Sequence, residues 1–186
     1  MYNPYMVGKQ IYLRHPTEED VQGRWHEWFS DEEITKFLYE KFWPNTIEAQ
    51  LEFYKSFIDS RDRLGLSIVA KSNDKHIGVT SLMDINWVHR FATIGMVIGE
   101  REYRKGPVAA EAFGLMLRVA FLRLNLLNVK NGYCSSNINS EALNRLFKFK
   151  RVGQYENWCS IDGQFENLII EVLDRESWLK RNMQND

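Results

Sequence analysis

The sequence has little cysteine, few prolines and almost no net charge over its 186 residues. Its two cysteines, Cys134 and Cys159, form no CxxC pair and have no histidine nearby in sequence. This spacing favours buried free thiols over a disulfide framework or a zinc site. Because no repeat, low-complexity tract or Pro-rich linker divides the chain, we expect one domain spanning residues 1–186, without a bound metal.

The formal charge of −1 gives no overall attraction to nucleic acid or to an anionic membrane. No apolar run approaches the ~20 residues that span a bilayer, and residues 1–16 lack the apolar core of a signal peptide. These absences predict a cytoplasmic protein that binds neither nucleic acid nor membranes. The hydrophobic fraction of 44% suits a chain that buries a sizeable core.

The first third of the chain predicts one strand followed by helices. Apolar and polar residues alternate over residues 10–15, which indicates a short strand. Start signals at Thr17 and Ser30 predict two helices within residues 16–38. Thr46 can cap a third helix, which we expect to end near residue 60.

From residue 64 the apolar period changes to two, which predicts three antiparallel strands. A long helix that is apolar on most of its circumference follows, then a strand, a short amphipathic helix, two strands joined at Asp162–Gly163, and a C-terminal helical tail. We expect a mixed α+β fold, with a mostly antiparallel central sheet of about seven strands flanked by helices.

The segment REYRKGPVAAEAF, residues 101–113, looks like a loop that feeds a helix. A helix N-terminus exposes unpaired N–H groups and a partial positive charge, so it favours an anion such as pyrophosphate. The side chains of Arg104 and Lys105 would attract the anion, and the small residues that follow would let it approach the backbone closely. The alternative is that Gly106 and Pro107 only end a strand and start a helix, since proline suits the first helical position.

This loop resembles the acyl-CoA-binding loop of the GNAT superfamily of N-acetyltransferases, whose pattern is R/Q-x-x-G-x-G/A. Arg104 and Ala109 match the first and last positions, and Pro107 replaces the middle glycine. Proline removes one possible N–H donor and fixes φ near the helical value. The charges of Arg104 and Lys105 would offset the lost donor by meeting phosphate oxygens directly.

Downstream, NINSEALNRLFKF is similar to the N-x-x-S helix and following G-F of the branch that acetylates protein N-termini and amino-sugars. Asn137, Ser140 and Phe149 match, whereas Lys148 replaces the glycine. The resemblance implies a sheet splayed between two strands to admit CoA. The CoA site that it implies comprises Met96, Val97, Ile98, Arg104, Lys105, Gly106, Val108, Ala109, Ala110, Asn137 and Ser140.

Amide formation from a thioester needs a deprotonated amine and a proton for the leaving sulfur. Many GNAT enzymes take that proton from a tyrosine four residues after the serine, but Asn144 stands there. The resemblance therefore assigns sulfur protonation to Ser140 and contact with the pantetheine arm to Asn137; the alternative is that both residues only cap the helix. We favour Asp84 and His89 as the general base, over four further candidates: His26, Glu33, Glu100 and Glu102. The alternatives are that these residues are surface groups and that a chain of water molecules relays the proton.

A dense group of aromatic residues lies between residues 24 and 43. We predict that Trp28, Glu33 and Phe37 bind the acceptor, through aromatic stacking and attraction of an ammonium; the alternative is core packing. A basic cluster is either a solvated face or the contact for the 3′-phosphate of CoA, and it comprises Arg145, Lys148, Lys150 and Arg151.

These observations predict an acetyl-CoA-dependent N-acetyltransferase that acts on a primary amine of a small molecule, for example an amino-sugar or a sugar nucleotide. One alternative acceptor is a protein N-terminal amine. The other alternative is a CoA-binding or interaction module without turnover, which the departures at Pro107, Asn144 and Lys148 leave open. A monomer and a homodimer are equally compatible with the sequence.

Overall fold

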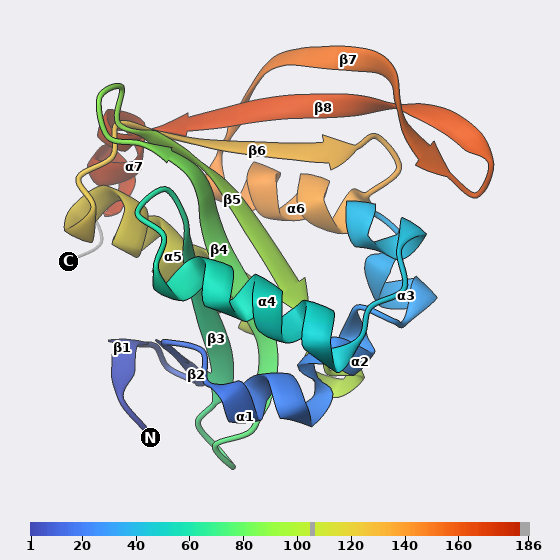
Figure 1. The fold of residues 1–186 in the computed structure, drawn as a ribbon. Coiled ribbons are helices and arrows are strands. Elements are labelled where there is room, and N and C mark those ends of the chain that lie inside the picture. Colours follow the sequence, from blue (N-terminus) through green and yellow to red (C-terminus); the bar gives the residue numbers. More distant parts are fainter. Residues whose placement is uncertain (105–106, 183–186) are drawn as a thin grey trace.

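One eight-stranded sheet organises the protein (Figure 1). The computed structural model describes residues 1–104 and 107–182. The strands lie in the order β1-β2-β3-β4-β5-β6-β8-β7, and all neighbours are antiparallel except β5 and β6. Their bounds are β1 Pro4–Val7, β2 Ile11–Arg14, β3 Leu64–Ala70, β4 His76–Asn86, β5 Phe91–Ile98, β6 Asn128–Cys134, β7 Lys150–Ile161 and β8 Gln164–Asp174.

The mixed, mostly antiparallel sheet confirms the predicted fold class. The difference is β1, a short strand that pairs with β2 through an irregular register. No helix among the described residues is long and apolar enough to cross a membrane. The helical elements are α1 Glu18–Asp20, η1 Val21–Trp25, α2 His26–Trp28, α3 Glu32–Thr35, η2 Tyr39–Phe42, α4 Ile47–Ile58, η3 Arg101–Tyr103, α5 Val108–Arg118, η4 Val119–Arg123, α6 Ile138–Phe147 and α7 Arg175–Asn182.

Side-chain caps start the first helices. The side chain of Thr17 accepts a hydrogen bond from the N–H of Asp20, which closes a capping box, and Thr46 caps α4 as predicted. The predicted start at Ser30 is wrong by one residue. The carboxylate of Asp31 caps α3 instead, because the Ser30 hydroxyl lies against carbonyl oxygens of preceding and following segments.

The two faces of the sheet carry different cores. On one face the apolar side of α5 is buried, including Phe113 and Met116, as its apolar pattern predicts. On the other face α4 crosses the sheet (Figure 1), and a second cluster buries Trp25, Trp28 and Tyr54. The strand residues divide in the same way, since Met96 packs with the α5 side and Val97 with the α4 side.

The sheet opens between β5 and β6. The two strands pair in parallel only from Phe91↔Asn128 to Thr93↔Lys130. Beyond that point β5 remains paired with β4 as far as Ile98, while β6 continues alongside β8. The edge of β5 that faces β6 therefore has no strand partner over its last residues, as expected of a sheet splayed to admit a ligand.

Two of the positions with left-handed backbone bear on the predictions from sequence. Asp162 and Gly163 have φ of 50° and 81°, and they form the predicted hairpin turn between β7 and β8. Lys148 ends α6 with φ of 62°. Glycine is the residue that adopts this conformation without a steric penalty, so the lysine here strains the helix end.

Candidate active site

The residues of the predicted CoA site converge on a cavity of about 590 Å³ where β5 leaves β6, which we call the strand-end cleft. Its walls come from the end of β5, the first turn of α5, the first turns of α6 and the segment from Glu33 to Leu38. Predicted residues that line it are Met96, Val97, Ile98, Arg104, Ala109, Ala110, Asn137, Ser140, Glu33 and Phe37.

Three predicted contacts differ from this set. Lys105 and Gly106 lie outside the described residues. The side chain of Val108 is buried in the core rather than in the cleft, because it occupies the inward face of α5. Only the backbone of Val108 is therefore available for the predicted role.

The first turn of α5 offers backbone donors beside this cleft. Pro107 precedes the helix with φ of −80°, and its carbonyl oxygen accepts the N–H of Glu111 at 2.8 Å. No side chain in the described part of the chain caps this helix. The first-turn N–H groups have no carbonyl partners within the helix, so the turn is built to meet an anion.

Arg104 serves the strand as well as the cleft. Its Nε and Nη2 donate to the carbonyl oxygens of Ile98 and Gly99, at 3.1 and 2.9 Å. Its Nη1 lies 3.6 Å from the carboxylate of Glu33, which also forms an ion pair with Arg101. Because two guanidinium groups already compensate Glu33, this carboxylate is poorly placed to attract an ammonium as predicted.

Asn137 and Ser140 are placed both to cap α6 and to contact a ligand in the cleft. The side-chain oxygen of Asn137 accepts the backbone N–H of Ser140 at 3.2 Å and so caps α6. Both residues also line the cleft. The hydroxyl of Ser140 makes no hydrogen bond to any described residue, and it is thus free to contact a ligand.

Asn144 cannot replace the missing tyrosine, because it is fully buried in a polar network. It accepts from Asn131 at 2.7 Å and donates to Glu171 at 2.8 Å. Tyr133 donates its hydroxyl to the same Glu171 at 3.1 Å, and burial together with this carboxylate raises the pKa of Tyr133 to about 12. The network ties β6, α6 and β8 together, and none of its four residues lines the cleft.

A second, smaller cavity of about 140 Å³ lies under α4, on the other face of β4 and β5. We call it the aromatic cavity, because four aromatic side chains line it: Trp25, Phe29, Phe53 and Phe57. It shares Leu38, Met96 and Val97 with the strand-end cleft. The two cavities therefore meet across the end of β5.

The prediction that Trp28 contacts the acceptor is wrong. Trp28 is 1% exposed and lines neither cavity. Its indole N–H donates to Glu100 at 3.0 Å, and its ring covers Gly99 so closely that a Cβ there would lie 1.9 Å away. Trp28 is a core residue, while its neighbour Trp25 reaches the cavity.

The favoured base candidates do not reach either cavity. Asp84 follows the lining residue Met83, but its carboxylate is exposed and accepts a hydrogen bond from Thr93 at 3.3 Å. His89 is exposed in the turn before β5. The reason is positional: the cavities meet at the C-terminal end of β5, whereas residues 84–90 approach its N-terminal end.

The other base candidates are already engaged. Glu100 is buried and paired with both Arg24 and Lys75, and Glu102 binds the same lysine. His26 contacts the carbonyl oxygen of Val21 through Nδ1 at 3.0 Å. Of all the predicted bases, only the compensated Glu33 lines the cleft.

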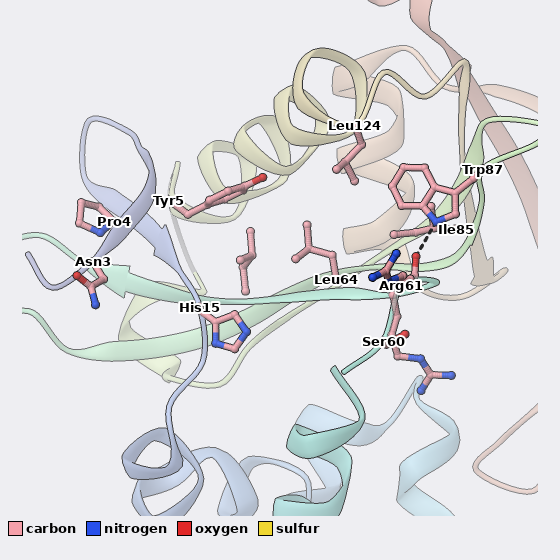
Figure 2. A pocket seen from close by; sticks show the side chains of 12 residues that line it. Asn3, Pro4, Tyr5, His15, Ser60, Arg61, Leu64, Ile85, Trp87 and Leu124 are labelled. Carbon is pink, nitrogen blue, oxygen red and sulfur yellow. Dashed lines mark hydrogen bonds between the residues drawn. The ribbon is translucent and has the colours of Figure 1, made fainter. Parts of the chain in front are cut away.

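A cavity larger than these two lies elsewhere on the sheet. It measures about 870 Å³ beside β1, and we call it the large cavity (Figure 2). Figure 2 shows Leu124 above Leu64, with Trp87 and Ile85 on one side and Tyr5 on the other. Arg61 and Arg63 line it as well, but none of the residues that match the GNAT patterns does.

Two smaller predictions concern the cysteine thiols and the cluster of arginine and lysine side chains. Cys134 and Cys159 are buried free thiols, as predicted, and burial raises the pKa of Cys134 to about 12. The basic cluster is exposed and does not line the cleft. Within residues 1–104 and 107–182, no three His, Cys, Asp or Glu side chains gather as they would around a metal ion.

Comparison with known proteins points to the same chemistry. The family model of the acetyltransferase (GNAT) domain matches residues 10–150 of this sequence. Spermidine N(1)-acetyltransferase of Escherichia coli K12 is 23% identical over 164 residues, which cover 88% of this chain and 86% of that protein.

Solved structures agree at the level of the fold. Spermidine N-acetyltransferase from Vibrio cholerae, in complex with CoA and spermine, has a TM-score of 0.84 and 19% identity, over 92% of this chain and 99% of that one. A dodecameric structure of that enzyme has a TM-score of 0.79 and 19% identity, and the match covers 94% of this chain and 99% of that one. The chain belongs to the GNAT acetyltransferase family, and its activity is acetyl-CoA-dependent N-acetylation.

Proposed function

We propose that this protein transfers the acetyl group of acetyl-CoA to a small-molecule primary amine, with both substrates meeting at the end of β5. The observation that carries the proposal is the junction of two cavities over Met96 and Val97. One cavity offers a helix N-terminus and an open strand edge, and the other offers a mostly apolar pocket for an acceptor.

The residues of the cleft fit CoA. The unpartnered edge of β5 would hydrogen-bond the pantetheine arm, and the first-turn amides of α5 would hold the pyrophosphate, assisted by Arg104. Asn137 would contact the arm from α6. When bound, acetyl-CoA supplies the thioester carbonyl that the amine attacks.

Ser140 is the group we assign to the leaving sulfur. Its hydroxyl lines the cleft and has no hydrogen-bond partner among the described residues. A hydroxyl in that position would donate a hydrogen bond or a proton to the thiolate. The serine can do this while its backbone N–H stays in the α6 cap.

The acceptor amine would lose its proton mainly through its surroundings. The aromatic cavity is apolar, and burial in such a site disfavours the charged form of an amine and lowers its pKa. This effect replaces part of the work of a general base, and no uncompensated carboxylate or histidine from the described residues lines either cavity. Asp84 and His89 stay predictions that this geometry does not support.

The amino-sugar and the protein N-terminus stay candidate acceptors. Both carry several polar groups, whereas the polar side-chain groups that the described residues bring to the aromatic cavity are the hydroxyls of Thr80 and Ser81 and the indole N–H of Trp25. The relatives named above act on spermidine, which is also a small amine. A monomer or homodimer stays a prediction.

Calorimetric titration with acetyl-CoA and a thiol-release assay with pooled primary amines test this proposal. We expect binding, thermal stabilisation by several kcal/mol at saturating ligand, and amine-dependent release of CoA thiol. Binding without release for any amine would favour the non-catalytic module. No binding at millimolar acetyl-CoA would sink the proposal.

The proline of the loop gives a finer test of CoA binding. Pro107→Gly restores a backbone donor, so we expect acetyl-CoA affinity to be preserved or increased. A clear loss of affinity would show that the loop does not act as an anion cradle.

A further inference from the structure

We infer that the acceptor is an arylalkyl primary amine with a single charge, whose ring occupies the aromatic cavity and whose nitrogen lies over Met96 and Val97. This inference rests on the proposed function and goes beyond it, because it selects one class of amine. It also departs from the polyamine named for the relatives.

The size of the aromatic cavity matches one ring. Its volume is about 140 Å³. An apolar cavity of about 150 Å³ in a protein interior stays dry and binds benzene. The cavity therefore accommodates one six-membered ring, with the chain that bears the nitrogen extending toward the shared residues.

The walls of the cavity suit an aromatic partner. Trp25 and Phe53 meet edge to face, with ring centroids 6.4 Å apart at 80°, and Phe53 and Phe57 do so at 4.8 Å and 85°. Edge-to-face packing is the arrangement that aromatic rings prefer, and a further ring extends it.

The absence of charge excludes a second ammonium. Among the lining residues that the structure describes, none is ionisable. Of the two hydroxyl groups in the lining, that of Thr80 already donates to the carbonyl oxygen of Gly95 at 3.0 Å. A buried ammonium without a carboxylate or several hydrogen bonds is strongly disfavoured, so a polyamine or a heavily hydroxylated sugar would bind poorly.

Among the described residues, the neighbouring strand-end cleft brings one carboxylate near the cavity. Glu33 lines the neighbouring cleft but forms ion pairs with Arg101 and Arg104. A polyamine chain that extended into the cleft would compete with these two guanidinium groups. A monoamine needs no such partner, because its one nitrogen is the reacting atom.

Gly95 keeps the cavity open from the side of β5. A Cβ built there would meet only the Ser81 hydroxyl oxygen, at 3.2 Å, and the backbone has no positive φ that would exclude a side chain. A larger residue at this position would therefore fill the cavity rather than disrupt the strand.

The test is thiol release from acetyl-CoA by the wild-type protein with 2-phenylethylamine, ethylamine, spermidine, glucosamine and a short peptide with a free N-terminus. We expect kcat/KM for 2-phenylethylamine to exceed that for each of the others by at least about tenfold. A higher value for spermidine, glucosamine or the peptide would overturn the inference while leaving the proposed function intact. No release with any amine would instead overturn the proposed function.

The variant Gly95→Val locates the ring. We expect it to lower kcat/KM for 2-phenylethylamine by about tenfold or more, because it removes the space for the ring. Its kcat/KM for ethylamine should fall clearly less than that for 2-phenylethylamine, and the protein should still be stabilised by acetyl-CoA. The matched control is Gly153→Val on the exposed part of β7, where a Cβ meets nothing within 4 Å. An equal loss for both amines, or no loss for either, would contradict the placement of the ring.

Discussion

The large cavity beside β1 and the strand-end cleft beside β5 lie on the same sheet but differ in construction. The large cavity is the bigger, at about 870 Å³ against about 590 Å³, and it carries two arginines. The strand beside it, β3, is paired along its length with β4. Beside the cleft, β5 pairs with β6 only as far as Thr93 and is then paired on one edge alone, with β4. A helix N-terminus without a side-chain cap points at the same place.

This difference is the reason why we place the proposed reacting site in the smaller of the two cavities. A ligand that carries phosphates and amides needs donors and acceptors that the fold has left unpaired, and strand divergence supplies them. The cleft also connects to a second cavity, which gives two substrates a common point. The large cavity has no such connection to the residues of the family pattern.

The largest expected effect separates two serines, one in each cavity. Ser140→Ala should lower kcat about 100-fold, because the leaving sulfur loses its hydrogen-bond or proton donor. Ser60→Ala, in the large cavity, should leave kcat unchanged. Steady-state kinetics with saturating amine measures both, and equal kcat values for the two variants would remove Ser140 from the chemistry.

Protonation of His76 at acid pH should destabilise the folded protein at the wall of the aromatic cavity, whereas no such effect is expected at the large cavity. His76 packs against Trp25 and Trp28, with ring centroids 6.0 and 4.9 Å apart. Burial lowers the pKa of His76 to about 4, although the nearby Asp20 acts in the opposite direction. In the unfolded chain the His76 side chain is therefore protonated below about pH 6.5, whereas in the folded protein it is protonated only below about pH 4.

The free energy of unfolding should thus fall as the pH drops from 6.5 to 4, by up to roughly 3 kcal/mol. Denaturant titrations across this range measure the slope. His76→Gln should flatten it, whereas His15→Gln, at the exposed rim of the large cavity, should not. Equal slopes in all three proteins would show that His76 is not buried as a neutral side chain.

An intermediate effect is expected at Arg104, with Arg61 as its control. Arg104→Ala should weaken acetyl-CoA binding about tenfold, since it removes a charge from the cleft and frees the carbonyl oxygens at the end of β5. Arg61→Ala removes a charge of the same kind from the large cavity and should leave the affinity unchanged. Calorimetry on both variants distinguishes a local contact from a general loss of positive charge.

The smallest effect concerns the helix that carries Ser140. Lys148→Gly should raise the free energy of unfolding by about 1 kcal/mol, because glycine adopts the left-handed end of α6 without strain. Lys150→Gly, in the extended backbone of β7, should instead be neutral or destabilising. Thermal unfolding of both variants provides the measurement, and a destabilised Lys148→Gly would mean that the lysine side chain stabilises this turn.

Local signals predicted most of the fold. The caps at Thr17 and Thr46 and the Asp162–Gly163 turn depend on neighbours in sequence, and they are confirmed. The start of α3 was misplaced because Ser30 and Asp31 are both good caps, and only tertiary contacts of the serine decide between them. Strand β1 was missed because it is short and pairs irregularly.

The acceptor side was harder to predict. Trp25 and Trp28 differ in role because η1 and a non-helical Gly23 interrupt the helical period between residues 21 and 25. The aromatic cavity joins this segment with Phe53 and Phe57 from α4, so no local pattern contains it. Residues of the strand-end cleft follow contiguous motifs, so their convergence on one cavity was predictable.

The most direct measurement fills each cavity in turn and titrates acetyl-CoA. Ala110→Trp places an indole in the strand-end cleft, and Leu124→Trp places one in the large cavity. With both variants shown to be folded by thermal unfolding, we expect Ala110→Trp to abolish measurable binding and Leu124→Trp to bind as the wild type does. Binding that survives Ala110→Trp and is lost in Leu124→Trp would contradict the assignment of the strand-end cleft as the CoA site.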